Sequence, residues 1–170
     1  MNVRRHLAAA VASFALLATV PANATELRES RSHVIVDVPD GWSTMVEGDY
    51  ATAHPKDQTF HLRIKGTEHS YEGEQKAEDH ALTFLRNHFD NITVDRHGKR
   101  VDWGNFYGVE VFGHGTEKNA EGTPGKFFLL LLIDKKDGKR GCVAVGTGTV
   151  AGFDKHHRGI YEALHTLRTY

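Results

Sequence analysis

The chain carries two hydrophobic periodicities, and their order along the sequence predicts its fold. Residues 32–38 and 60–65 alternate apolar and polar side chains with a period of two, which is typical of strands with one buried face. A turn at Pro39-Asp40-Gly41 follows the first segment, and a turn at Pro55-Lys56-Asp57 precedes the second. Residues 50–54, between the two turns, belong to the same series of strands. The chain from residue 32 to residue 65 is therefore predicted to be an antiparallel meander.

A helical period then replaces the strand period. Apolar and aromatic side chains recur at Ala77, Ala81, Phe84, Leu85 and His88, which places them on one stripe of a helix. A second stripe at the C-terminus follows the same spacing and consists of Phe153, His157, Ile160, Leu164 and Leu167. We expect an amphipathic helix at each place.

Strands occupy the region between the two predicted helices. We expect strands at 92–96 and 101–103, joined by a His97-Gly98 turn, then at 107–114, and an exposed loop at 115–125. Residues 127–133 are apolar without interruption, which predicts a central strand covered on both faces. A charged hairpin loop and a strand at 142–147 follow. The order of strands, helix, strands and helix predicts an α+β fold: an antiparallel β-sheet covered by helices on its faces.

In the order of these elements the chain resembles the Mog1/PsbP-like family, and the resemblance covers nearly all of the chain after residue 24. The residues that carry the resemblance are Val38-Pro39-Asp40-Gly41-Trp42, Ala53-His54-Pro55, the predicted helix at 74–89, the approach at 104–108 and the last helix after Gly152. The resemblance implies a Mog1/PsbP-like sandwich that acts by protein–protein contact in an accessory role. The segment 115–125 does not align with the family.

The first 24 residues have the pattern of a cleavable export signal. Arg4 and Arg5 precede an apolar run from Leu7 to Val20, and Ala22-Asn23-Ala24 forms a small-residue cleavage site. The run is too short to span a bilayer, which needs about 20 residues. We therefore expect a single domain at 25–170, periplasmic or secreted, with no integral membrane segment after cleavage; Sec and twin-arginine export stay open.

Charge and composition exclude several classes of function. The chain has a net charge of −1, with 21 basic and 22 acidic residues that do not cluster, so no nucleic-acid partner is expected. The segment 146–152 is glycine-rich but lacks the dinucleotide-binding spacing and has no second strand after it. We interpret it as a turn that lets the last helix pack closely. No serine lies in G-x-S-x-G, and Cys142 is flanked by strand residues. We therefore name no catalytic and no cofactor-binding residue.

Histidine is the unusual component of the sequence, with twelve residues in all. They are dispersed and match no sequence-local metal motif. His33, His54 and His61 are nevertheless candidate metal ligands, because neighbouring strands could bring them together and imidazole suits zinc and copper.

The sequence thus favours an exported, non-catalytic binding or accessory protein, with Trp42 and Trp103 as candidate contacts for a protein partner of unknown identity. The alternative is a periplasmic metal- or small-ligand-binding protein that uses the dispersed histidines. An alternative interpretation of both tryptophans is that they belong to the core.

Overall fold

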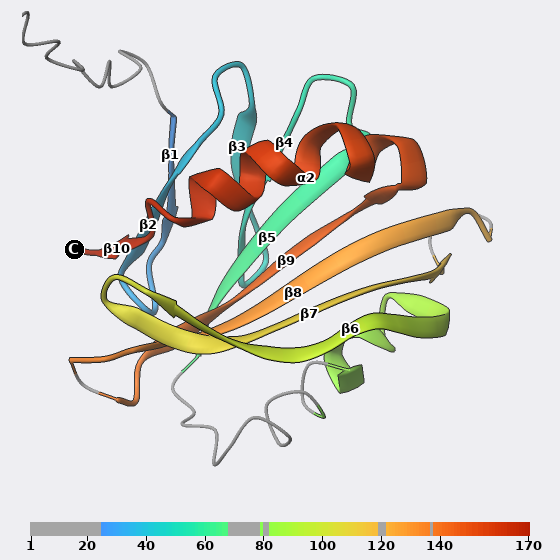
Figure 1. Cartoon of the computed structure of the whole chain (residues 1–170). Coiled ribbons are helices and arrows are strands. Elements are labelled where there is room, and N and C mark those ends of the chain that lie inside the picture. Colours follow the sequence, from blue (N-terminus) through green and yellow to red (C-terminus); the bar gives the residue numbers. More distant parts are fainter. Residues whose placement is uncertain (1–24, 68–78, 80–81, 119–121, 137) are drawn as a thin grey trace, which may run out of the picture.

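The structure is a computed structural model that describes residues 25–67, 79, 82–118, 122–136 and 138–170 (Figure 1). The expected export signal at 1–24 and the first part of the expected helix at 74–89 lie outside these residues. The elements in chain order are β1 (Thr25–Glu29), β2 (Val34–Val38), β3 (Ser43–Glu47), β4 (Tyr50–His54), β5 (Phe60–Thr67), β6 (Phe89–Trp103), β7 (Phe106–Glu117), β8 (Pro124–Asp134), β9 (Gly141–Thr149), α2 (Val150–Leu164) and β10 (Arg168–Thr169).

Two antiparallel sheets form the framework. The large sheet has seven strands in the order β3-β4-β5-β9-β8-β7-β6, and the small sheet has three in the order β1-β2-β10. Strand β8 lies inside the large sheet and pairs with β7 on one side and β9 on the other. Figure 1 shows α2 lying across one face of the large sheet, with β1 and β2 beside it.

The alternation of side chains along β8 builds a core on each face of the large sheet. Phe128, Leu130 and Leu132 point toward α2 and the small sheet, where they pack with β2, β5 and the buried face of α2. Phe127, Leu129 and Leu131 point to the opposite face and pack with Leu85 and Phe89 among others. The uninterrupted apolar run at 127–133 is thus explained, because a central strand covered on both faces has no solvent side for polar residues.

Small residues let α2 approach the sheet closely. Helix α2 begins at Val150, directly after β9, and the side chain of Thr149 caps it by accepting a hydrogen bond from the Gly152 N–H at 3.1 Å. A Cβ at Gly152 would lie 2.1 Å from the carbonyl oxygen of Thr59, and one at Gly146 would lie 2.2 Å from the ring of Phe128. Gly152 therefore sets how closely the start of α2 approaches the segment before β5, and Gly146 leaves room for the Phe128 ring of the adjacent strand β8.

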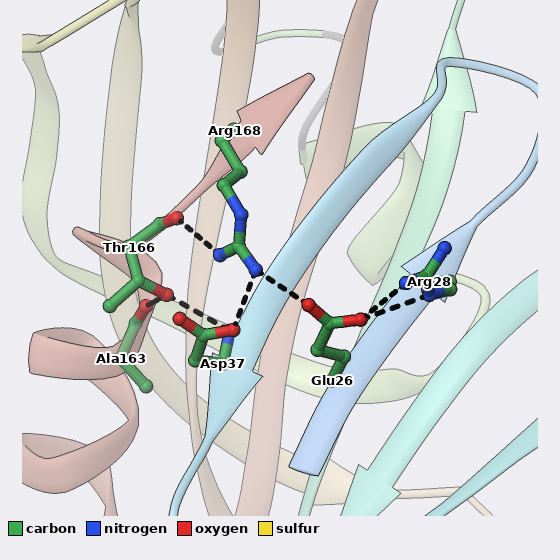
Figure 2. Close-up of polar contacts among 6 residues, drawn as sticks. All are labelled: Glu26, Arg28, Asp37, Ala163, Thr166 and Arg168. Carbon is green, nitrogen blue, oxygen red and sulfur yellow. Dashed lines mark hydrogen bonds and ion pairs between the residues drawn. The ribbon is translucent and has the colours of Figure 1, made fainter. Parts of the chain in front are cut away.

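The C-terminal segment after α2 is tied to the small sheet (Figure 2). Arg168 donates to Asp37 on β2 at 3.0 Å and to Glu26 on β1 at 2.8 Å. The Thr166 hydroxyl accepts a hydrogen bond from the Asp37 N–H at 2.9 Å and donates to the Ala163 carbonyl at 2.7 Å. These contacts join the end of α2 to β1 and β2, so the small sheet and the helix cover the large sheet as one layer.

The expected α+β architecture is confirmed, with corrections to individual elements. Residues 89–103 form one continuous strand whose pairing with β7 shifts register three times, so the expected His97-Gly98 turn is wrong: β-bulges absorb the irregularity. The expected loop at 115–125 is shorter, because β7 continues to Glu117 and β8 begins at Pro124. The expected turn at 146–152 is also wrong, since β9 runs to Thr149 and α2 follows at once. Strands β1 and β10 have no counterpart among the elements that the sequence predicts.

Two glycines of the same helix provide a matched test of this packing. We expect Gly152→Ala to lower the free energy of unfolding by about 1–3 kcal/mol, because the new methyl group meets the Thr59 backbone. Gly159→Ala, where a Cβ meets nothing within 4 Å, should instead stabilise the protein by about 0.5–1 kcal/mol. Urea unfolding of both variants measures the difference, and equal changes would contradict the close approach.

Candidate functional site

The two tryptophans lie on opposite flanks of α2. Trp42, between β2 and β3, makes edge contacts with Phe60 at 5.9 Å and with His156 at 5.6 Å between ring centroids. Trp103, at the end of β6, lies 4.2 Å from the ring of His165 and 5.1 Å from that of Tyr161. Both are half-buried and pack against the core, so they anchor the helix and still present part of each ring at the surface.

A buried carboxylate lies beneath the helix on the Trp103 flank. The side chain of Glu110 on β7 is only 2% exposed and accepts a hydrogen bond from the Tyr161 hydroxyl. The guanidinium of Arg96 on β6 lies 3.0 Å from the same carboxylate, and its carbon lies 4.1 Å from the centre of the Phe112 ring. Burial and the nearby Glu110 raise the pKa of Tyr161, so its hydroxyl stays a donor. Removing either partner would leave a buried charge under-satisfied.

Next to this network, the helix and the sheet leave an open groove, which we call the α2 groove. Its volume is about 470 Å³, in the range of small-ligand sites. It lies between the N-terminal half of α2 and strands β6, β7 and β8, with the side chains of Phe112 and Phe153 as apolar lining. Its polar lining comes from Asp95, Arg96, Lys126, Asp154 and His157.

The charged side chains of the α2 groove are held in pairs. Lys126 bonds Asp154 at 2.7 Å, and Asp95 bonds His114 at 3.0 Å. His157 stacks on Phe153 with an interplanar angle of 8°, and its Nδ1 lies 2.8 Å from the Phe153 carbonyl oxygen, which leaves Nε2 free of that bond. Arg96 is fixed by Glu110 and Phe112 yet 46% exposed. The groove therefore offers an apolar surface with pre-oriented donors, an arrangement suited to binding.

The candidate metal ligands are only partly brought together. The rings of His54 and His61 lie 5.7 Å apart, on adjacent strands β4 and β5. His33 lies in the turn before β2 and contacts Tyr170 at 5.4 Å. This turn lies beside Gly66, five residues further along β5 than His61 and hence about 17 Å away. The structure thus places two of the three candidates side by side and the third at the other end of β5.

In the part of the chain that the structure describes, the remaining acidic, histidine and cysteine side chains do not add a further ligand cluster. Within residues 25–67, 79, 82–118, 122–136 and 138–170, no group of three or more His, Cys, Asp or Glu side chains is placed to hold a metal ion. Most histidines in these ranges contact aromatic rings instead, as His156 on α2 and His165 at its C-terminal end do with Trp42 and Trp103. Cys142 is fully buried on β9, and burial raises its pKa to about 12, which leaves the thiol protonated. Among the same residues, no helix has the length and apolar character needed to cross a bilayer.

Comparison with solved structures identifies the fold. LpqN of Mycobacterium tuberculosis, described as involved in cell envelope biogenesis, matches with a TM-score of 0.60 at 13% identity over 87% of this chain and 91% of that chain. The Ran-binding protein Mog1p of Saccharomyces cerevisiae matches with a TM-score of 0.57 at 9% identity over 86% and 95% of the two chains. CyanoP, the PsbP of Synechocystis sp. PCC 6803, gives 0.57 at 9% over 94% and 99%. The chain therefore has the Mog1/PsbP-like fold. No protein-family model and no curated protein sequence matches it.

The sequence did not reveal the network around Glu110. Glu110 sits among apolar strand residues and Arg96 on a bulged strand, so their spacing alone does not show that the two side chains meet. A signal did exist: a single carboxylate in the middle of an alternating strand needs a partner if it is buried. Its partners are Arg96 on β6 and Tyr161 on α2, two elements that only the tertiary fold brings together.

Two half-buried histidines predict how stability depends on pH. Burial, followed by the positive charge of Arg63, lowers the pKa of both His61 and His88 in the folded protein. As the pH falls through the ordinary histidine pKa of about 6.5, the unfolded chain therefore binds more protons than the folded protein does. The free energy of unfolding is thus highest above that pH and decreases as the pH drops. We expect the melting temperature to decrease between about pH 7.5 and 5.5, with a shallower decrease in His61→Asn/His88→Asn. Identical slopes for the two proteins would contradict the assignment.

Proposed function

We propose that the protein is an exported, non-catalytic binding protein that acts by protein–protein contact, and that the α2 groove is its contact site. The groove carries the proposal because it combines the rings of Phe112 and Phe153 with charged groups that are already oriented by their partners. Apolar surface with pre-ordered polar groups favours association, since less side-chain entropy is lost on binding. Mog1p, which has the same fold, is described as Ran-binding, and this supports a protein-binding role.

The contact surface extends toward Trp103. Phe112 contacts Tyr161 at 6.0 Å, and Tyr161 contacts Trp103, so aromatic side chains continue from the groove along this flank of α2. Tryptophan and arginine are enriched among the interface residues that contribute most of the binding free energy. Trp103 and Arg96 are therefore the proposed anchors. Trp42, on the other flank, would serve a separate contact.

Export places this contact outside the cytoplasm. The proposal for location rests on the basic, apolar and small-residue segments of 1–24, and the mature domain would begin at Thr25. N-terminal sequencing of the protein recovered from the exporting cell measures the cleavage point directly.

A charge reversal at the groove tests the proposed contact. We expect Lys126→Glu to reduce capture of a stoichiometric partner from the exporting cell by about tenfold or more, because it breaks the Lys126–Asp154 pair and adds a negative charge to the groove. Folding should change little, since exposed ion pairs contribute about 0–1 kcal/mol.

Lys136→Glu is the matched control, because Lys136 lies just beyond the opposite end of β8 from Lys126. The purified partner should bind the wild type and the control equally in isothermal titration calorimetry. Equal loss of binding in both variants, or no loss in either, would refute the groove as the contact site.

The paired histidines support a second candidate function, the binding of zinc or copper. His54 and His61 supply two imidazoles on adjacent strands, and the lowered pKa of His61 keeps its ring neutral and able to coordinate near neutral pH. A tight site needs further ligands, from solvent or from a binding partner.

Single histidine substitutions distinguish zinc binding at the His54–His61 pair from zinc binding at the His33 end of β5. If zinc binds through this pair, His54→Ala and His61→Ala should each weaken binding at least about tenfold, whereas His33→Ala should leave it unchanged. Calorimetric titration with zinc alone measures the three variants. Binding that survives both substitutions would exclude the pair as the site.

A further inference from the structure

Strand β3 is an open edge of the large sheet. It is the first strand in the sheet order, and all five of its residues are exposed, including Met45 at 50% and Val46 at 78%. Its pairing with β4 is regular from Ser43 to Glu47, without a bulge. Sheet edges are usually protected against pairing by lysine, proline or bulges, and β3 has none of these.

The other edge of the same sheet is protected. Strand β6 shows three register shifts in its pairing with β7 and carries several charged residues, among them Asp95, Arg96, Lys99 and Arg100. Bulges and charges on an edge prevent the addition of a further strand. The contrast within one sheet singles out β3.

The hairpin geometry shows which backbone groups of β3 face outward. A two-residue turn, Gly48-Asp49 with φ of +60° at Gly48, connects Glu47 to Tyr50. Such a turn closes on a hydrogen-bonded pair, and these pairs then alternate along the ladder. The backbone groups of Glu47, Met45 and Ser43 are thus directed at β4, and those of Thr44 and Val46 at the open edge.

These outward groups fit a second copy of the same strand in one register. Antiparallel pairing about a two-fold axis at Met45 sets Thr44 of each copy against Val46 of the other, which forms four backbone hydrogen bonds. A register centred on Thr44 would require the Trp42 N–H, which already bonds the Pro39 carbonyl at 3.2 Å. A register centred on Val46 would bring the two Glu47 side chains close together.

The charges of β3 favour the Met45 register as well. Glu47 is the single charged residue of the strand, and in this register it lies opposite the uncharged Ser43 of the other copy. The two Glu47 residues are then four positions apart, or about 14 Å, beyond the screening length of about 8 Å at physiological salt. The apolar side chains meet instead, Met45 against Met45 on one face and Val46 against Thr44 on the other.

We propose that two copies of the chain associate through antiparallel β3–β3 pairing centred on Met45, which joins their large sheets into one continuous sheet. A pairing of five residues buries little area, so the dimer is weak and reversible. Because the α2 groove lies at the β6–β8 half of the sheet, both grooves stay accessible, and a dimer offers two binding sites to a multivalent partner. The inference does not depend on the groove's function.

A charge-complementation experiment tests the pairing directly. Sedimentation velocity of the purified protein up to millimolar concentration should show a monomer–dimer equilibrium. Met45→Lys and Met45→Glu should each weaken it at least about fivefold, because like charges then face each other across the axis. An equimolar mixture of these two variants should associate again, since opposite charges then meet.

Two further variants distinguish this interface from other modes of association. Thr44→Pro removes an outward N–H but no bond to β4, so it should weaken the dimer while the melting temperature stays near that of the wild type. Tyr107→Lys, a charge at another partly exposed strand residue, should leave association unchanged. A protein that stays monomeric throughout, or a dimer that Met45→Lys and Thr44→Pro do not affect, would overturn the proposal.

Discussion

The need to cover β8 on both faces governs the rest of the structure. Residues 127–133 of this strand are almost completely buried, and each Phe or Leu so buried contributes about 1.5–3 kcal/mol relative to an exposed position. Alternate residues point to opposite faces, so a layer on one side alone would leave half of them in water. Helix α2 and the small sheet cover one face, while Leu85 and Phe89 pack on the other.

The position of the α2 groove follows from this cover. Gly152 allows α2 to lie close to the sheet at its start, and the C-terminal contacts of Arg168 and Thr166 join its far end to β1 and β2. The helix fixed in this way leaves the β6–β8 side of its N-terminal half uncovered, where the groove forms. The same placement brings Tyr161 onto Glu110, so the buried carboxylate is satisfied by the element that creates the groove.

Much of the fold could be predicted because local pattern and burial agree. The alternation in β2 and β5 and the stripe of α2 each favour one type of element, and the shortness of the apolar run in β8 favours a strand over a helix. The predictions failed where tertiary pairing overrides local chemistry. His97-Gly98 has the composition of a turn, but pairing with β7 on both sides of it keeps β6 continuous. The glycines after Val145 also have the composition of a turn, but β5 and β8 hold them in β9.

For the candidate sites, the sequence by itself determined which chemistry is present, and the tertiary structure decided which groups meet. The sequence supplied dispersed histidines, two tryptophans and a chain without a recognisable catalytic motif. It could not show that His54 and His61 are neighbours while His33 lies at the other end of β5, since that depends on strand register. Nor could it show that Glu110, Arg96 and Tyr161 form one network, or that β3 is left as an open edge. Such contacts join residues far apart in the chain, and only the packing that covers β8 brings them together.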